Sequence, residues 1–104
     1  MSKTVKLKKY GMCKSILSKG MGLMFSRKKT LVFEFRKEKK IDLHMWFVFF
    51  PIDIYFLNKK KKVIELKKKF KPFRFYSPKK KAKYVIEIPR PHKYKINIGD
   101  TIKF

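Results

Sequence analysis

A fifteen-residue segment from His44 to Asn58 constrains the fold of this chain more than any other part of its sequence. The segment reads HMWFVFFPIDIYFLN and carries one formal charge, Asp53. The whole chain carries a net charge of +23, from 30 Lys and Arg against 7 Asp and Glu. Because charged side chains are rarely buried without partners, the core is expected to form around this apolar segment.

The composition predicts one mostly-β domain covering residues 1–104. A chain of 104 residues is long enough for a single modest core. Its 11 Phe and 5 Tyr argue against disorder. Val, Ile, Phe and Tyr dominate the apolar residues and Ala occurs once, which favours strands over helices.

Short apolar segments predict six to seven strands and one helix. The run from Leu43 to Phe49 is apolar on both faces, which is typical of a central strand, and Pro51 should interrupt the ladder after it. Residues Met12 to Lys19 predict a short helix that Gly20 ends. The expected fold is a small β-sandwich or a partly open barrel with one short N-terminal helix. Strands are expected near residues 5–7, 31–36, 43–49, 52–56, 63–66, 84–88 and 101–104.

Four of the seven acids lie inside predicted strands, each on the face opposite its apolar neighbours. For Glu34 and Glu65, cross-strand pairing with lysines is the simplest interpretation. Asp53 is predicted to be partly buried, and a buried carboxylate needs hydrogen-bonded partners. Backbone amides near Pro51, His44, or a Lys or Arg are candidate partners, and both a structural and a ligand-facing role stay open.

A candidate ligand pocket includes His44, Trp46, Asp53 and Glu87. His44 and Trp46 are two residues apart, so they should project from one face of a strand. An imidazole and an indole near a carboxylate could line a pocket, although a satisfied core His beside a core Trp is the alternative. Asp100, which follows a glycine, is expected to bond local backbone amides in a turn.

The chain lacks motifs for catalysis, metals or cofactors. Cys13, His44 and His92 are isolated, and CxxC, HxH and HExxH patterns are absent. P-loop, GxSxG and GxGxxG motifs are also absent. We therefore predict no catalytic residues, no metal and no cofactor. An enzyme that uses Asp53 with Glu87 or His44 is a lesser alternative, because no spacing forces these side chains together.

Association with nucleic acid is a second hypothesis. Only four basic residues are Arg, and the other 26 are Lys, a hydrated point charge that suits non-specific contacts. In the segment FKPFRFYSPKKK, aromatic and basic residues interleave as they do in stacking platforms. The alternative is a solvated lysine coat that reflects an AT-rich genome. The candidate surface comprises Lys71, Phe73, Arg74, Phe75, Lys79, Lys80 and Lys81.

The sequence also predicts a compartment and an assembly state. The single cysteine, Cys13, cannot form an internal disulfide, and the first residues lack the apolar region of a signal peptide. The longest apolar run, from Met45 to Phe50, is too short to span a bilayer. We expect a cytoplasmic protein without a membrane partner, and a monomer, because a charge of +23 disfavours self-association.

Six motifs together resemble, in order and spacing, the family called domain of unknown function 192 (uncharacterised protein family 0127). The resemblance covers roughly residues 19–104 and implies a small, mostly-β fold without an assigned activity. This chain departs from the family pattern at Ser26, at Phe47 to Phe50, where relatives often have polar residues, and at Pro89-Arg90-Pro91, which replaces a glycine turn. A pocket formed by those polar residues in relatives would be altered here. The motifs are GLMF (residues 22–25), LVFEF (31–35), HMWF (44–47), PIDIYFLN (51–58), YVIEIP (84–89) and IGDTIKF (98–104).

Overall fold

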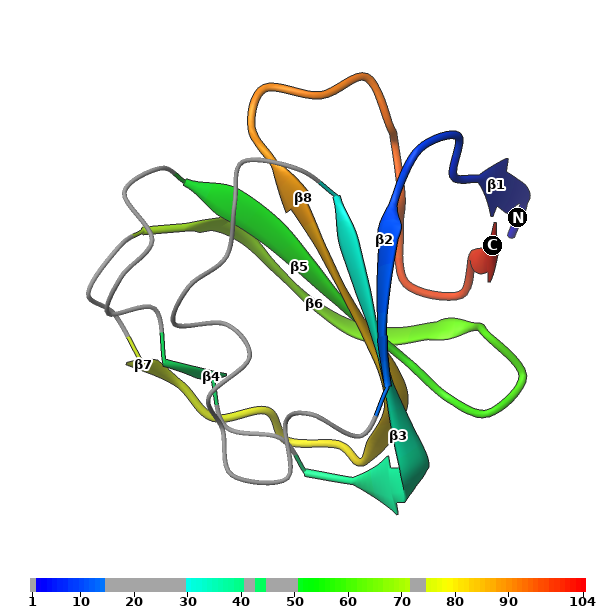
Figure 1. Cartoon of the computed structure of the whole chain (residues 1–104), viewed down its shortest axis with the longest axis vertical. Helices are drawn as coiled ribbons and strands as arrows, with labels where there is room; N and C mark the ends of the chain where they lie inside the picture. Colours follow the sequence, from blue (N-terminus) through cyan, green and yellow to red (C-terminus); the bar gives the residue numbers. More distant parts are fainter. Residues whose placement is uncertain (1, 15–29, 41–42, 45–50, 72–74) are drawn as a thin grey trace.

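The computed structural model describes residues 2–14, 30–40, 43–44, 51–71 and 75–104. These residues form nine strands in three sheets (Figure 1). The prediction of a mostly-β fold is confirmed, and the strands do not close into a barrel within the described ranges. The strands are β1 (Thr4–Lys6), β2 (Gly11–Lys14), β3 (Leu31–Lys39), β4 (Leu43–His44), β5 (Ile52–Leu57), β6 (Val63–Phe70), β7 (Phe75–Tyr76), β8 (Ala82–Pro89) and β9 (Thr101–Lys103).

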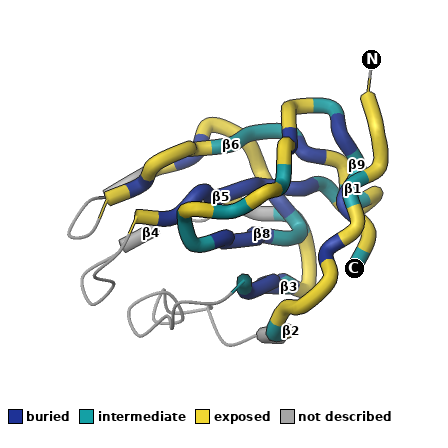
Figure 2. The backbone as a smooth tube through the Cα atoms, turned by 90° about the horizontal axis from the view of Figure 1, so that it is seen from above, coloured by how far each residue is buried: buried dark blue, intermediate teal, exposed yellow. Residues whose placement is uncertain are grey.

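The main sheet has five strands in the order β2-β3-β8-β5-β6. β2 and β3 run parallel, and the other neighbours in this sheet are antiparallel. β5 lies inside the sheet and is buried along its whole length (Figure 2). A strand buried on both faces is expected to be apolar throughout, so Asp53 in β5 is an exception that requires partners.

Each face of the main sheet carries its own apolar cluster. Phe33 and Ile54 belong to the cluster on the first face, whereas Val32 and Tyr55 belong to the cluster on the second face. This division follows from the alternation of side chains along a strand. The β1–β9 pair covers the second face and contributes Ile102 to its cluster. The β4–β7 pair lies on the opposite side of the main sheet (Figure 1).

The predicted helix over Met12 to Lys19 is wrong in its first part. Met12 and Cys13 lie in β2 and pair with Val32 and Phe33 of β3, while residues 15–19 lie outside the described residues. A helix of this length is marginal in isolation, so pairing with a neighbouring strand decides the local structure. The described part of the chain contains no helix, and therefore none long and apolar enough to cross a membrane.

The aromatic segment is divided between two sheets. Leu43 and His44 form β4, which pairs with β7, so the first two residues of the predicted central strand do not join the main sheet. Residues 45–50 lie outside the described residues. Pro51 comes directly before β5, a position that suits a residue without an amide donor.

The turn that precedes β9 ties the end of the chain to its N-terminal segment. Asp100 accepts hydrogen bonds from the Asn97 amide at 2.8 Å and from the Lys3 amide at 3.1 Å. The bond from Asn97 is the main reason that the pKa of Asp100 lies below its ordinary value. Gly99 has a φ of 97°, which glycine adopts without strain. The prediction of a turn acid is confirmed, and the bond to Lys3 is an additional long-range contact.

Candidate ligand pocket beside Asp53

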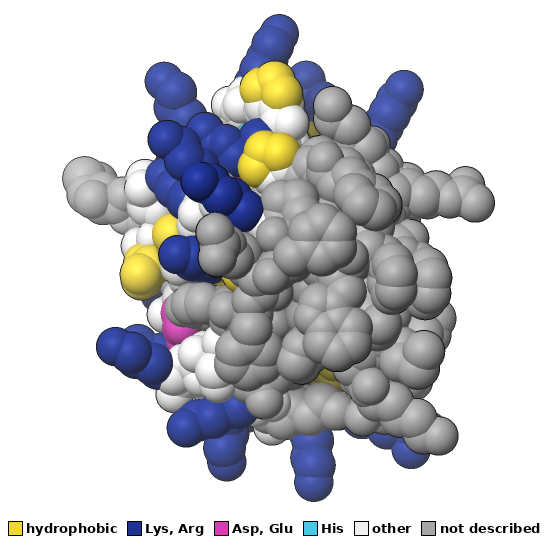
Figure 3. Space-filling view, turned by 90° about the vertical axis from the view of Figure 1, so that its left-hand side faces the viewer, with side chains coloured by type: hydrophobic (Ala, Val, Ile, Leu, Met, Phe, Trp, Pro, Cys, Tyr) yellow, Lys and Arg dark blue, Asp and Glu magenta, His cyan; other side chains and the backbone are white. Residues whose placement is uncertain are grey.

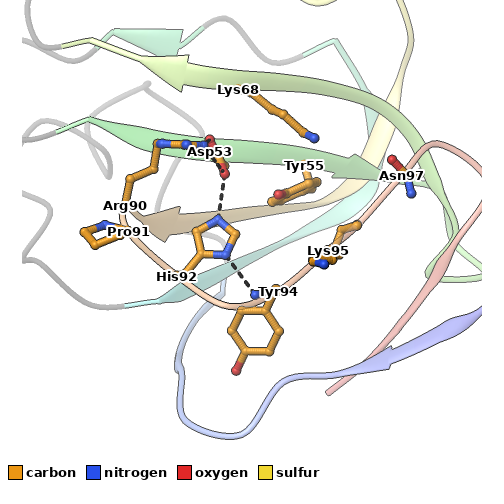
Figure 4. Close-up of a pocket in the computed structure, with 10 residues that line it drawn as sticks. Asp53, Tyr55, Lys68, Arg90, Pro91, His92, Tyr94, Lys95 and Asn97 are labelled. Atoms are coloured by element: carbon orange, nitrogen blue, oxygen red, sulfur yellow. Dashed lines mark hydrogen bonds and ion pairs between the residues drawn. The ribbon is translucent and has the colours of Figure 1, made fainter.

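A pocket of about 410 Å³ lies beside Asp53 on the second face of the main sheet. β5 and β6 contribute one side of the pocket, and the segment from Arg90 to Asn97 contributes the other (Figure 4). This segment connects β8 to β9. Among the lining residues, the charged and titratable side chains are those of Asp53, Tyr55, Lys68, Arg90, His92, Tyr94 and Lys95.

The register of the main sheet brings Asp53 and Arg90 together. Asp53 lies directly opposite Ile88, and Arg90 follows Ile88 by two residues, so it projects from the same face. Diagonal neighbours of this kind are within reach of long side chains. The Arg90 amide also donates a hydrogen bond to the Pro51 carbonyl at 3.1 Å, which extends the ladder past the end of β8.

A β-bulge in β6 shapes the other side of the site. The pairing moves from Ile52 opposite Phe70 to Ile54 opposite Lys67, so both Lys68 and Lys69 face Asp53. Bulges of this kind redirect side chains and often lie next to functional sites. Lys69 has a φ of 55°, a left-handed conformation that costs an L-residue about 1–2 kcal/mol.

The Asp53 carboxylate contacts two other parts of the chain, the bulge in β6 and the segment from Arg90 to Asn97. Its Oδ1 accepts a hydrogen bond from the Lys69 amide at 2.9 Å, which gives this amide of the bulge a partner. Nη1 of Arg90 donates to Oδ1 at 2.9 Å and to Oδ2 at 3.0 Å. Nε2 of His92 lies 2.6 Å from Oδ2. The Asp53 side chain is 3% exposed, so these contacts replace the water that it loses on folding.

These contacts determine the charge of Asp53. Burial is the largest influence, and by itself it would raise the pKa of Asp53. The hydrogen bonds from the Lys69 amide, Arg90 and His92 together outweigh burial, so the pKa of Asp53 lies below its ordinary value of 3.8. Asp53 is therefore an anion at neutral pH.

His92 is held as a neutral donor by its two hydrogen bonds. The Tyr94 amide donates to Nδ1 of His92 at 3.1 Å, so Nδ1 carries a lone pair and no proton. The proton of a neutral imidazole then lies on Nε2, which donates it to Asp53. We assign this tautomer from its hydrogen-bond partners. With both nitrogens engaged, His92 has no free position from which to act as a general base.

Tyr55 lies next to Asp53 along the second face, two residues further on in β5. Burial of its ring raises the pKa of Tyr55 above the ordinary value of 10.0, and the negative charge of Asp53 raises it further. The phenol therefore stays protonated at physiological pH, and its hydroxyl is engaged in a hydrogen bond with the Asp53 carboxylate.

The charged groups of the pocket are mostly positive. Lys68, Arg90 and Lys95 line it together with one carboxylate, that of Asp53. In Figure 4 the Lys68 side chain extends from β6 over Tyr55, and Lys95 approaches from the opposite segment. At the bottom of the pocket, the charges of Asp53 and Arg90 offset each other within one hydrogen-bonded group. Lys68 and Lys95 add two positive charges to the lining.

The structure places Asp53 and Glu87, which were both predicted to line the pocket, on opposite faces of the main sheet. Asp53 lines the pocket, but Glu87 lies opposite Ile54 in the pairing of β5 with β8, so it projects from the first face of the sheet. Asp53 and Glu87 are therefore not brought together as a carboxylate pair. His44 belongs to β4, outside the main sheet, and Trp46 lies outside the described residues.

The candidate nucleic-acid surface is described only in part. Lys71, Lys79, Lys80 and Lys81 are exposed, whereas Phe73 and Arg74 lie outside the described residues. Phe75 lies in β7, and its side chain is not described. The backbone amides of Lys79 and Lys80 each donate to Oε1 of Glu65 at 3.0 Å. Glu65, which was expected to pair with lysine side chains, thus anchors the loop that precedes β8.

Sequence reasoning missed Arg90, His92, Lys68 and Lys95 as pocket residues. A usable signal was the segment Pro89-Arg90-Pro91-His92, which places two nitrogen-bearing side chains directly after a buried strand.

Asp53 and His92 are both potential metal ligands, but their polar atoms are already hydrogen-bonded to protein groups. No third His, Cys or acidic side chain joins them among the described residues.

Comparisons with known proteins point to one family. The sequence pattern of the DUF192 family, described as Uncharacterized ACR, matches residues 4–104. A UPF0127 protein of Pyrococcus furiosus is 35% identical over 95 residues, which are 86% of this chain and 81% of the relative. A UPF0127 protein of Pyrococcus horikoshii is 37% identical over 95 residues, which are 86% of this chain and 82% of the relative.

Two solved structures share the fold. One is from Sinorhizobium meliloti and is described as a candidate transcription regulator. It has a TM-score of 0.67 at 16% identity, and the match covers 77% of this chain and 67% of that protein. The other is a Novosphingobium aromaticivorans protein of unknown function. It has a TM-score of 0.64 at 17% identity, and the match covers 77% of this chain and 61% of that protein. At these identities the likeness concerns the fold alone.

Proposed function

This chain belongs to the DUF192 family, which is described as uncharacterised, and we propose that it is a non-enzymatic domain that binds a small molecule in the pocket beside Asp53. A volume of about 410 Å³ falls within the range of small-molecule sites, which is about 300–1,000 Å³. Polar groups from two sides converge on this volume, as they do in sites that orient a ligand.

The observation that carries the proposal is the hydrogen bonding at the base of the pocket. Both oxygens of Asp53 and both nitrogens of His92 have partners within the protein. Acid–base catalysis needs a group that is free to exchange a proton with a substrate. Groups engaged in this way support binding by holding the walls of the pocket in place.

A thermal-shift screen with metabolites of each charge class tests the proposal. A bulky residue in place of Asn97, which is exposed and lines the pocket, should abolish the stabilisation by any compound that binds there. Asn97→Trp is the test variant. Ile98→Trp is the matched control, because Ile98 is 64% exposed and does not line the pocket. If every stabilising compound acts equally on both variants, or if none stabilises the protein, the proposal is wrong.

Non-specific association with nucleic acid is the second candidate. Its support is the exposure of Lys71, Lys79, Lys80 and Lys81 near β7 and β8. Phosphate contacts of this kind release counterions, so the logarithm of affinity should fall linearly with the logarithm of salt concentration. A salt titration of RNA binding decides the case. Binding that is lost near physiological salt and lacks base preference would be counterion release by the lysine coat and would count against a nucleic-acid function.

A further inference from the structure

The pocket offers hydrogen-bond donors in excess of acceptors. Lys68 and Lys95 each present an ammonium group, on either side of Tyr55 in Figure 4. These donors come from β6 and from the segment after β8, so they face one volume from different directions. A ligand that satisfies them must supply acceptors.

The single carboxylate of the pocket does not repel an incoming anion as a free acid would. Asp53 is 3% exposed and shares both oxygens with the Arg90 guanidinium. The Lys69 amide and His92 donate to it as well. Its charge is therefore largely compensated within the protein, which leaves the ammonium groups of Lys68 and Lys95 as the uncompensated charges of the lining.

Arg90 retains donors for a ligand. Only its Nη1 contacts Asp53, and the side chain is 33% exposed. Among the described residues, no hydrogen bond is recorded for Nη2 or Nε of Arg90. A guanidinium fixed at one nitrogen presents its other donors in a defined plane, the geometry that suits two-oxygen recognition of carboxylate or phosphate. Asp53 thus acts as a positioning residue for Arg90.

From this arrangement we infer that the ligand carries a terminal oxyanion, a carboxylate or a phosphate, which Lys68, Lys95 and Arg90 bind. The inference rests on the proposed function and specifies its ligand class. A cationic ligand would meet the two ammonium groups and find Asp53 already engaged. A neutral ligand would cover the ammonium groups of Lys68 and Lys95 without pairing their charges, which is unfavourable because the covered groups lose contact with water.

The test must separate the pocket from the rest of a protein with a net charge of +23. Inorganic phosphate and acetate serve as anionic probes and glycerol as the neutral probe, each titrated at constant ionic strength and followed by amide NMR shifts. The test variant is Lys68→Gln with Lys95→Gln. The control is Lys60→Gln with Lys103→Gln, which removes the same charge at two exposed lysines outside the pocket.

We expect a saturable shift of the Tyr55 and Lys95 amides with phosphate, with acetate, or with both, and the stronger probe identifies the type of oxyanion. Affinity should fall about tenfold in the test variant, the equivalent of one charge-assisted contact, and less than twofold in the control. Equal losses in both variants would assign anion binding to the general lysine coat and overturn the inference.

Two other outcomes distinguish failure of the oxyanion inference from failure of the proposed binding function. If neutral compounds from the thermal-shift screen bind the pocket while anions do not, the oxyanion inference is wrong and the proposed binding function stands. If compounds of every charge class leave the pocket amides unmoved, both fail.

Discussion

At the scale of single residues, Asp53 connects its own strand, β5, with two other parts of the chain, β6 and the segment after β8. It accepts hydrogen bonds from the bulge in β6, from Arg90 beyond β8, and from His92. A buried carboxylate is unfavourable alone, so the cluster is stable only with all its donors in place. The same side chain therefore lines the candidate pocket and ties three elements of the fold together.

Replacement of this carboxylate should destabilise the protein. In Asp53→Asn, the amide group would turn a donor toward either Arg90 or the protonated Nε2 of His92. We expect the free energy of unfolding to fall by about 2–3 kcal/mol, the size of a lost hydrogen bond to a charged group, as measured by urea unfolding. Glu38→Gln is the control, because Glu38 accepts one exposed bond from the Lys59 amide. A loss no larger than that of the control would contradict the prediction.

The low pKa values of Asp53 and Asp100 predict acid sensitivity. Both groups have a pKa below the ordinary 3.8 in the folded protein. Such groups stabilise the folded state fully above the ordinary pKa, and this contribution is lost as pH falls through the folded pKa. The urea midpoint should therefore drop below about pH 4.

Asp53→Asn combined with Asp100→Asn should flatten this dependence, which urea unfolding at several pH values would measure. An unchanged slope in the double variant would show that other groups control the acid response. The same experiment with each single substitution separates the two carboxyl groups, which lie in different parts of the fold.

At the scale of elements, the bulge in β6 is the most informative local feature. Two of its residues, Lys68 and Lys69, oppose the single residue Asp53. This irregularity places a lysine in the pocket lining and gives the Lys69 amide to the carboxylate. Residues in unusual backbone conformations persist where their surroundings require them, and often at functional sites.

The strain at Lys69 can be removed without loss of its hydrogen bond. In Lys69→Gly the backbone amide still donates to Asp53, and the left-handed φ of 55° no longer costs energy. After the entropic cost of glycine, we expect a gain of about 0.5–1 kcal/mol in the free energy of unfolding. Lys67→Gly, at another exposed position of the strand, should instead lose about 0.5–1 kcal/mol. Equal losses in both variants would contradict the prediction.

At the scale of the whole molecule, charge is the dominant property. Basic side chains, Lys or Arg, project at the top, the left and the bottom of the view in Figure 3. Exposed lysines of the described residues come from β1, from the turn after β5, from β6, from the loop before β8 and from β9. This spread favours a general coat over a single basic face, although the pocket adds a concave site to it.

A net charge of +23 predicts stabilisation by salt. Self-repulsion of the folded chain is screened when the Debye length falls from about 30 Å at 0.01 M to about 8 Å at 0.15 M. We expect the urea midpoint to rise over this range of NaCl in a buffer free of phosphate and carboxylate. Lys68→Gln with Lys95→Gln should show nearly the same rise, because 28 of the 30 basic residues remain. A midpoint that does not respond to salt would contradict the prediction.

The order of elements along the chain could be predicted from the sequence because it depends on local patterns. Alternation identified β3 and β5, short apolar segments identified β6 and β8, and Pro51 marked an interruption directly before β5. The period of two also predicted that Asp53 would project away from its isoleucine neighbours. The first part of the helix predicted over Met12 to Lys19 was wrong, because Met12 and Cys13 pair with residues of β3 that lie twenty positions further along the chain.

What the sequence alone determined is the mostly-β class, the family, the excess of positive charge and the buried acid in β5. The partners of that acid were decided by the tertiary structure. Register between β5 and β8 brings Arg90 to Asp53, and a bulge turns Lys68 and Lys69 toward it. The same register places Glu87 on the other face. Local patterns determine which face of its own strand a side chain uses, but which residues meet across strands depends on pairing and offset, which no local pattern contains.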